Sequence, residues 1–269
     1  MEVVVPDGTR LYVVEQGPRD AEPVLWLQGL NAPAAAWAVQ LAHFGQTRRS
    51  VAPDARGVGK SDAPPGPYST AQLAEDAVAV LDAVGIDSAH VVGTSLGGAA
   101  AQELALRHPK RVRSLALLAS FAVQSPRSAA LLKSWRELYP LAVKHREAWE
   151  LQAYAWLFTD KFWRTEANVR AALRFARTQP QQSVQGFLGQ VDAALAHDTR
   201  DRLGQLKVPA AVIHGREDQL SPFACGEELA RLIPGAELTA LDGVGHAANL
   251  EGQRAVHAAL RSLWKRAPL

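Results

Sequence analysis

Ser95 stands in the stretch Gly93-Thr94-Ser95-Leu96-Gly97-Gly98, between the apolar run His90–Val92 and a stretch rich in small residues. A strand that turns sharply into a helix lifts a serine hydroxyl above the edge of a sheet, and the flanking glycines leave room for that turn. The helix that follows directs the partial positive charge of its N-terminus at the same place. The pattern therefore predicts a nucleophilic serine, with an ordinary glycine-rich turn as the alternative interpretation.

An acid and a histidine follow this serine in the chain, each in a loop after an expected strand. The run Ala210–Ile213 leads to Asp218 through a G-x-x-D loop, and the run Glu237–Leu241 leads to His246 through a glycine-rich loop. A neutral imidazole can accept the proton of a serine, and a carboxylate can hold the correct tautomer of that imidazole. His214, at the end of the first strand, is interpreted as structural.

The elements that must position these residues alternate between short apolar strands and helical patterns, which indicates a mostly parallel sheet with helices on both faces. The expected strands lie at Val3–Val5, Leu11–Val14, Val24–Leu27, Ser50–Ala52, His90–Val92, Val112–Leu118, Ala210–Ile213 and Glu237–Leu241. The expected helices lie at Ala34–Phe44, between Ser69 and Gly85, and at Leu96–Arg107, Pro222–Leu232 and Gln253–Trp264.

Residues 120–205 interrupt this alternation, because they are helix-prone and lack strand patterns. They contain four of the seven Trp and five of the seven Phe. These aromatic residues either form the core of a helical subdomain or line an apolar pocket beneath a cap, and both can hold for different residues. The segment is too long for a plain loop. We therefore expect a core domain of residues 1–119 and 206–269 and a helical cap of residues 120–205.

The order of serine, acid and histidine resembles that of the α/β-hydrolase superfamily, as does Asp54-Ala55-Arg56-Gly57-Val58-Gly59-Lys60-Ser61-Asp62, which is similar to that family's D-x-R-G-x-G-x-S loop. The resemblance covers essentially the whole chain outside the expected cap. It implies an α/β fold with a mostly parallel eight-stranded sheet flanked by helices, and a helical cap inserted after the sixth strand. It also implies a catalytic triad of Ser95, Asp218 and His246. The implied oxyanion hole consists of the backbone N–H groups of Leu30 and Leu96.

The loop after the third strand departs from the family pattern. Such loops usually begin His-Gly, whereas here Gln28 precedes Gly29, and Gln28 is expected to brace the loop by a hydrogen bond. Asn31 has two interpretations, because its amide could point at the substrate or merely hold the turn. The remaining candidates for substrate contact are aromatic: Trp37, Trp135, Trp156 and Trp163.

The resemblance implies a serine hydrolase of a small apolar ester or lactone, similar to enol-lactonases and small carboxylesterases, that works through an acyl-enzyme without a cofactor. Related members with the same triad hydrolyse carbon–carbon bonds of vinylogous diketones, or act as perhydrolases and haloperoxidases. An alternative of another class is a small-ligand receptor or signalling protein built on a hydrolase fold. The sequence separates these poorly, because the chemistry depends on pocket details that a fold does not determine.

Composition narrows the class further. A chain of 269 residues with 48% apolar and 21% charged residues is not wholly disordered, and a net charge of +2 gives no reason to expect nucleic acid or a membrane surface as partner. The single cysteine, Cys225, cannot form an internal disulfide, and the first residues lack a secretory-signal pattern. A reducing, cytoplasmic location is therefore expected. The sequence contains no cluster of His and Cys residues that could bind a metal, so a metal site is not expected.

Overall fold

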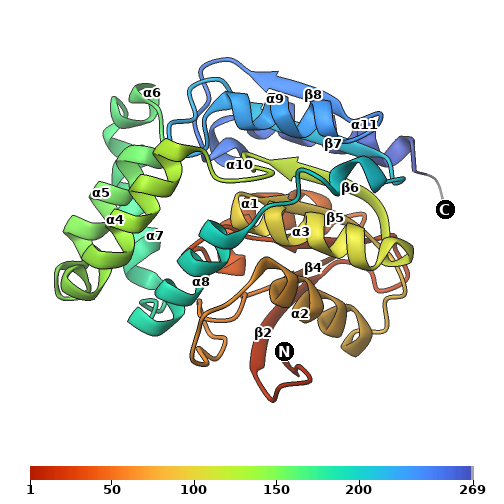
Figure 1. Cartoon of the computed structure of the whole chain (residues 1–269), viewed down its shortest axis with the longest axis horizontal. Coiled ribbons are helices and arrows are strands. Elements are labelled where there is room, and N and C mark those ends of the chain that lie inside the picture. Colours follow the sequence, from red (N-terminus) through yellow and green to blue (C-terminus); the bar gives the residue numbers. More distant parts are fainter. Residues whose placement is uncertain (268–269) are drawn as a thin grey trace.

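The computed structural model describes residues 1–267 and contains one sheet with the strand order β1-β2-β4-β3-β5-β6-β7-β8 (Figure 1). β2 runs antiparallel to both of its neighbours, β1 and β4, and all the other pairings are parallel. The prediction of a mostly parallel eight-stranded sheet is confirmed. The strands are β1 (Glu2–Val4), β2 (Arg10–Gln16), β3 (Pro23–Leu27), β4 (Arg49–Pro53), β5 (Ala89–Thr94), β6 (Val112–Leu118), β7 (Ala210–Gly215) and β8 (Glu237–Leu241).

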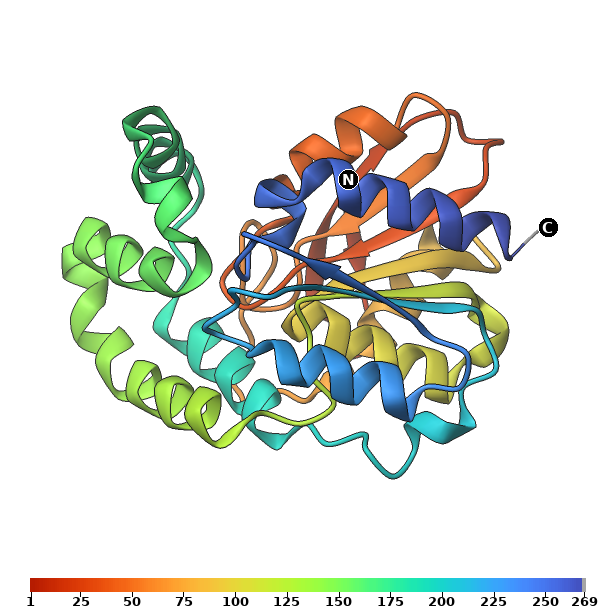
Figure 2. The ribbon, with the colours of Figure 1, turned by 90° about the horizontal axis from the view of Figure 1, so that it is seen from above.

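Helices cover both faces of this sheet (Figure 2). One core cluster joins one face to α1 and α11, and the other joins the opposite face to α2, α3 and α9. The helices outside the 120–205 segment are α1 (Ala38–Phe44), α2 (Thr70–Ala83), α3 (Leu96–Arg107), α9 (Phe223–Leu232), α10 (Ala248–Glu251) and α11 (Gln253–Lys265). Short 3-10 helices lie at Ala34–Trp37, Pro109–Arg111, Val143–His145 and Leu203–Gln205.

The central strands are apolar on both sides because each side meets a helical layer. In β5, Val91 belongs to the cluster beneath α3 while its neighbour Val92 belongs to the cluster beneath α11. Leu25 and Trp26 of β3 divide in the same way. Successive side chains of a strand point to opposite faces, so a continuous apolar run is what a strand buried between two layers requires.

The segment expected to be a cap follows β6, and its regular elements are helices, with one isolated bridge between Val123 and Asp198. Its helices lie beyond the end of the sheet at which β5, β7 and β8 terminate (Figures 1 and 2). They are α4 (Pro126–Ala142), α5 (Arg146–Leu157), α6 (Asp160–Trp163), α7 (Glu166–Thr178) and α8 (Val184–Ala196). None of the helices within residues 1–267 combines the length and the apolar composition needed to span a bilayer.

Candidate active site

Ser95 lies at the turn from β5 into α3, in a conformation that residues other than glycine rarely adopt. Its φ is 52° and its ψ is −121°. The turn is held because the Ser95 N–H donates to the Leu118 carbonyl at 2.9 Å, and the Ser120 hydroxyl donates to the Ser95 carbonyl at 2.9 Å. A Cβ at Gly97 would lie 2.3 Å from the carbonyl oxygen of Leu27. Glycine at that position therefore lets α3 begin directly behind the strained serine.

Asp218 lies in the loop after β7, and His246 lies in the loop after β8. Oδ2 of Asp218 is 2.8 Å from Nδ1 of His246, and Oδ1 accepts the backbone N–H groups of Leu220 at 2.9 Å and Ser221 at 2.8 Å. Burial on its own raises the pKa of Asp218, but the contacts with His246 and a second histidine outweigh burial and lower that pKa. An ionised, fixed carboxylate thus faces Nδ1 and leaves Nε2 of the ring for proton transfer.

The second histidine is His214, which was interpreted from the sequence as structural. It is completely buried, and its Nε2 lies 2.8 Å from the Ser221 carbonyl oxygen and 3.3 Å from Oδ2 of Asp218. It therefore packs against the acid loop, and both histidines contact the same carboxylate oxygen. Within residues 1–267, no group of three or more His, Cys, Asp or Glu side chains is arranged to hold a metal ion.

The loop from Gln28 to Asn31 passes directly beside the serine. A Cβ at Gly29 would lie 3.1 Å from Cβ of Ser95 and 3.7 Å from its Oγ. The Leu30 N–H donates to no other backbone group in the described part of the chain, and the Leu96 N–H is the first of α3 and so lacks an acceptor within the helix. Oε1 of Gln28 accepts the Gly29 N–H at 2.9 Å, so this side chain braces the loop from within.

Gln190 also supports this loop, although no sequence pattern marks it as a candidate. Asn31 has a φ of 60°, and its N–H donates to Oε1 of Gln190 at 3.1 Å. Gln190 is fixed in turn, because its Nε2 donates to the Arg56 carbonyl at 3.1 Å and its Oε1 accepts Nε2 of Gln182 at 3.0 Å. Helix α8 of the 120–205 segment thereby holds the turn at Asn31, and the side chain of Asn31 remains in the cavity lining.

The D-x-R-G-x-G-x-S loop, residues 54–61, supports neighbouring segments and does not line the cavity. Asp54 is buried, and its carboxylate accepts the backbone N–H groups of Ala34 at 2.6 Å and Lys60 at 2.8 Å. Arg56 forms a bidentate pair with Asp76, with both N–O distances at 2.6 Å. The bond from Ala34 thus fixes the segment that leads from the Gln28–Asn31 loop toward α1, and the pair with Asp76 fixes the D-x-R-G-x-G-x-S loop to α2.

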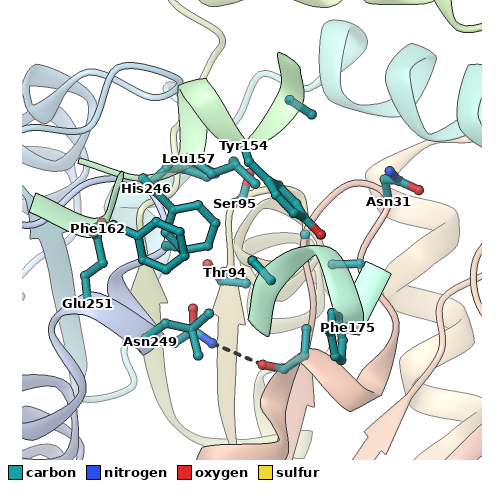
Figure 3. Close-up of a pocket in the computed structure, with 18 of the residues that line it drawn as sticks. Asn31, Thr94, Ser95, Tyr154, Leu157, Phe162, Phe175, His246, Asn249 and Glu251 are labelled. Carbon is teal, nitrogen blue, oxygen red and sulfur yellow. Dashed lines mark hydrogen bonds between the residues drawn. The ribbon is translucent and has the colours of Figure 1, made fainter. Parts of the chain in front are cut away.

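A cavity of about 680 Å³ lies between the end of the sheet and the 120–205 segment, with Ser95 and His246 in its wall. Figure 3 shows Tyr154, Leu157 and Phe162, which come from that segment, gathered around these two residues. The lining is mainly apolar. Apart from His246, the acidic and basic side chains among its described residues are Glu150, Lys161 and Glu251.

Two predicted substrate contacts, Asn31 and Trp135, line this cavity, whereas three others do not: Trp37, Trp156 and Trp163. Trp37 is completely buried in the core between the sheet and α1. Trp156 packs against the Arg127 guanidinium, 5.3 Å from its ring centroid, and Trp163 packs edge-on against Phe162. The prediction is wrong for these three residues for one reason. Aromatic character does not tell on which side of a helix or turn the cavity will lie.

The aromatic residues that do line the cavity include two groups with different burial. Trp135 and Trp149 are buried, with Trp149 packed edge-on against Trp135 at 5.7 Å and against Phe187 at 5.4 Å between ring centroids. Phe158 and Phe162 are half-buried and stack on each other at 3.8 Å. The first group is core and cavity wall at once, while the second contributes chiefly wall.

The chain as a whole is similar to known hydrolases. The family model described as alpha/beta hydrolase fold matches residues 22–253. The 2-hydroxymuconate semialdehyde hydrolase of Pseudomonas putida is 35% identical over 256 residues, covering 92% of this chain and 88% of that protein. The 3-oxoadipate enol-lactonase 2 of Acinetobacter baylyi is 28% identical over 254 residues, covering 93% and 91%. The solved structure of the enol-lactonase from Burkholderia xenovorans LB400 matches with a TM-score of 0.88 at 28% identity, covering 98% of this chain and 100% of that one.

Proposed function

This chain belongs to the α/β-hydrolase fold family and is a hydrolytic enzyme, and from this membership and the geometry of the site we propose that it is a serine hydrolase of a small, uncharged, apolar ester or lactone. One observation carries the proposal. His246, bonded through Nδ1 to the buried Asp218 at 2.8 Å, shares the wall of one apolar cavity with Ser95, which stands on a strained turn.

In the proposed mechanism, Ser95 Oγ attacks the carbonyl carbon as Nε2 of His246 takes its proton. The N–H groups of Leu30 and Leu96 stabilise the oxyanion, and Asp218 stabilises the imidazolium. The leaving alkoxide, or the enolate that an enol-lactone gives when its ring opens, takes the proton from His246 as its bond to the acyl carbon breaks. Water then attacks the acyl-enzyme with His246 as base, and Ser95 recovers its proton.

The charges in the cavity support an uncharged substrate. Glu150 and Glu251 both contribute to the lining, whereas the basic side chain there, Lys161, is exposed. Burial raises the pKa of Glu150, which favours the uncharged form of that side chain in this poorly solvated part of the wall. An anionic group on the substrate would lose hydration on entry and would meet the carboxylate of Glu251. The apolar remainder of the wall favours hydrocarbon on both sides of the scissile bond.

A second candidate, hydrolysis of a carbon–carbon bond in a vinylogous diketone, is favoured by the 35% identity to the 2-hydroxymuconate semialdehyde hydrolase of Pseudomonas putida. The same serine, histidine and cavity would serve that reaction. Its leaving group is a carbon anion, which needs a proton just as the oxygen anion that leaves an ester does. The two candidates differ in which substrates turn over, not in the machinery that we assign.

The test is a substrate panel assayed with the wild-type enzyme and with Ser95→Ala. It contains p-nitrophenyl esters of increasing chain length, a five- and a six-membered lactone, a vinylogous diketone, and dimethyl glutarate beside monomethyl glutarate. We expect steady turnover of the neutral esters or lactones, loss of that turnover in Ser95→Ala, and a higher kcat/KM for the dimethyl ester than for its monoanion.

Each alternative gives a different result in the same panel. Turnover of the diketone alone would replace the ester or lactone assignment with carbon–carbon hydrolysis. A kcat/KM for the monoanion equal to or above that for the dimethyl ester would overturn the uncharged substrate. Tight binding with at most one slow turnover would point to a small-ligand receptor.

A further inference from the structure

The loop that carries His246 is fastened on both sides of the histidine. The N–H of Gly245 donates to Oε2 of Glu251 at 3.0 Å, and the N–H of Ala247 donates to the Leu157 carbonyl at 3.0 Å. A Cβ at Gly245 would lie 2.9 Å from that same Leu157 oxygen. The loop and the end of α5 are therefore in direct contact at this point, with no space for a side chain between them.

Glu251 continues this connection into the 120–205 segment. Its second oxygen, Oε1, accepts the Thr159 hydroxyl at 2.5 Å and the Thr159 N–H at 3.2 Å. Thr159 is 5% exposed and lies at the corner between α5 and α6. Phe158, which precedes Thr159, and Phe162, in α6, form part of the cavity wall. One carboxylate thus joins the histidine loop to the wall that faces the serine.

We propose that Glu251 is a positioning residue for His246. Its carboxylate holds the imidazole and the Leu157–Thr159 corner in place relative to each other. This inference rests on the proposed function, in which His246 is the general base. Glu251 acts through the backbone of Gly245 and takes no part in bond making. Since a misplacement of about 1 Å can cost about 10²-fold in rate, a residue that holds the histidine loop affects turnover more than substrate binding.

The chemistry of the side chain explains why a glutamate is suited to this position. Three donors converge on Glu251, and a carboxylate accepts hydrogen bonds on both oxygens. A glutamine of the same size accepts on one oxygen only, and its NH₂ group would face one of the N–H donors. The Thr159 hydroxyl can turn to accept from that NH₂ group, but a backbone N–H cannot. Glu251→Gln must therefore give up the bond from either the Gly245 N–H or the Thr159 N–H, without opening a cavity.

The test compares kcat and KM for a short p-nitrophenyl ester, together with Tm, in four variants of the full chain. Glu251→Gln removes the bond from one of the two backbone N–H groups, and Thr159→Val removes the hydroxyl bond but keeps the N–H bond. Glu227→Gln, which changes an exposed glutamate of α9, is the matched control. His246→Ala reports on the proposed function itself.

We expect Glu251→Gln to lower kcat about 10- to 100-fold at temperatures well below its Tm, with KM close to wild type. Thr159→Val should lower kcat less, in the same direction, and Glu227→Gln should leave both constants unchanged. A fall in Tm with unchanged kcat in Glu251→Gln would overturn the inference by making the residue merely structural. If Glu251→Gln does not fold, unchanged kcat in Thr159→Val overturns it instead. Activity retained in His246→Ala would overturn the proposed function, whatever Glu251 does.

Discussion

Nδ1 of His246 faces Oδ2 of Asp218 at 2.8 Å, while the adjacent Glu217 is exposed. Two carboxylates that are neighbours in sequence therefore have different surroundings, and only Asp218 can orient the imidazole. We expect Asp218→Asn to lower kcat by roughly 10⁴-fold, because the amide favours the wrong histidine tautomer. Glu217→Gln serves as the matched control and should leave kcat unchanged. Steady-state kinetics on one ester measure both, and the reverse ranking would show that the acid is Glu217.

The two groups of cavity aromatics should respond differently to truncation. Trp135→Ala removes a buried ring and should lower the free energy of unfolding by about 3–5 kcal/mol. Phe162→Ala removes a half-buried ring from the cavity wall. It should instead change the ratio of kcat/KM for bulky and short esters by a factor that corresponds to about 1–3 kcal/mol. Trp163→Ala, whose ring lies outside the cavity lining, is the control for selectivity. Urea unfolding and an ester chain-length series measure the two effects. Equal selectivity in all three variants would mean that this wall does not determine specificity.

Acid should destabilise the fold through buried histidines that remain neutral. Burial lowers the pKa of His90 to about 3 and that of His197 to about 4. In the unfolded chain these histidines bind protons near pH 6.5, whereas in the folded chain they do not. Their contribution to the free energy of unfolding is therefore fully present above pH 6.5 and is lost as the pH falls toward 4. Each histidine contributes a slope of about 1.4 kcal/mol per pH unit in that window.

This linkage can be measured as the free energy of unfolding at several pH values in His197→Gln and in His145→Gln. Residue 197 is buried and residue 145 is exposed. The first variant should have a slope between pH 6.5 and 4 that is shallower than wild type by about 1.4 kcal/mol per pH unit, and the second should match wild type. The same slope in both variants would mean that His197 takes up its proton in the folded protein as readily as in the unfolded chain.

The association of serine, acid and histidine could be predicted because each follows a strand of the same parallel sheet. Parallel strands end at a common edge, so residues 95, 218 and 246 had to arrive there whatever the intervening chain does. The expected strands Val112–Leu118 and Glu237–Leu241 and the helix Leu96–Arg107 agree with the observed bounds. Strong apolar runs between glycine and proline signals leave little freedom in such elements.

The supports of the site could not be predicted in this way. Gln190 meets Asn31 across 159 positions of sequence, and Glu251 meets Thr159 across 92. Both contacts depend on how the 120–205 segment sits on the sheet, and no local pattern specifies that placement. The same limit applies to Trp37 and Trp156, because composition identifies aromatic residues but not the side of the helix that faces the cavity.

The role of Ser95 as nucleophile is tested most directly by kcat of Ser95→Ala on the best neutral ester, measured beside its Tm. The substitution removes one oxygen atom from a half-buried position, so Tm should remain close to wild type. We predict that kcat falls by roughly 10⁴-fold or more. A folded Ser95→Ala protein that retains wild-type turnover would contradict nucleophilic catalysis by this residue.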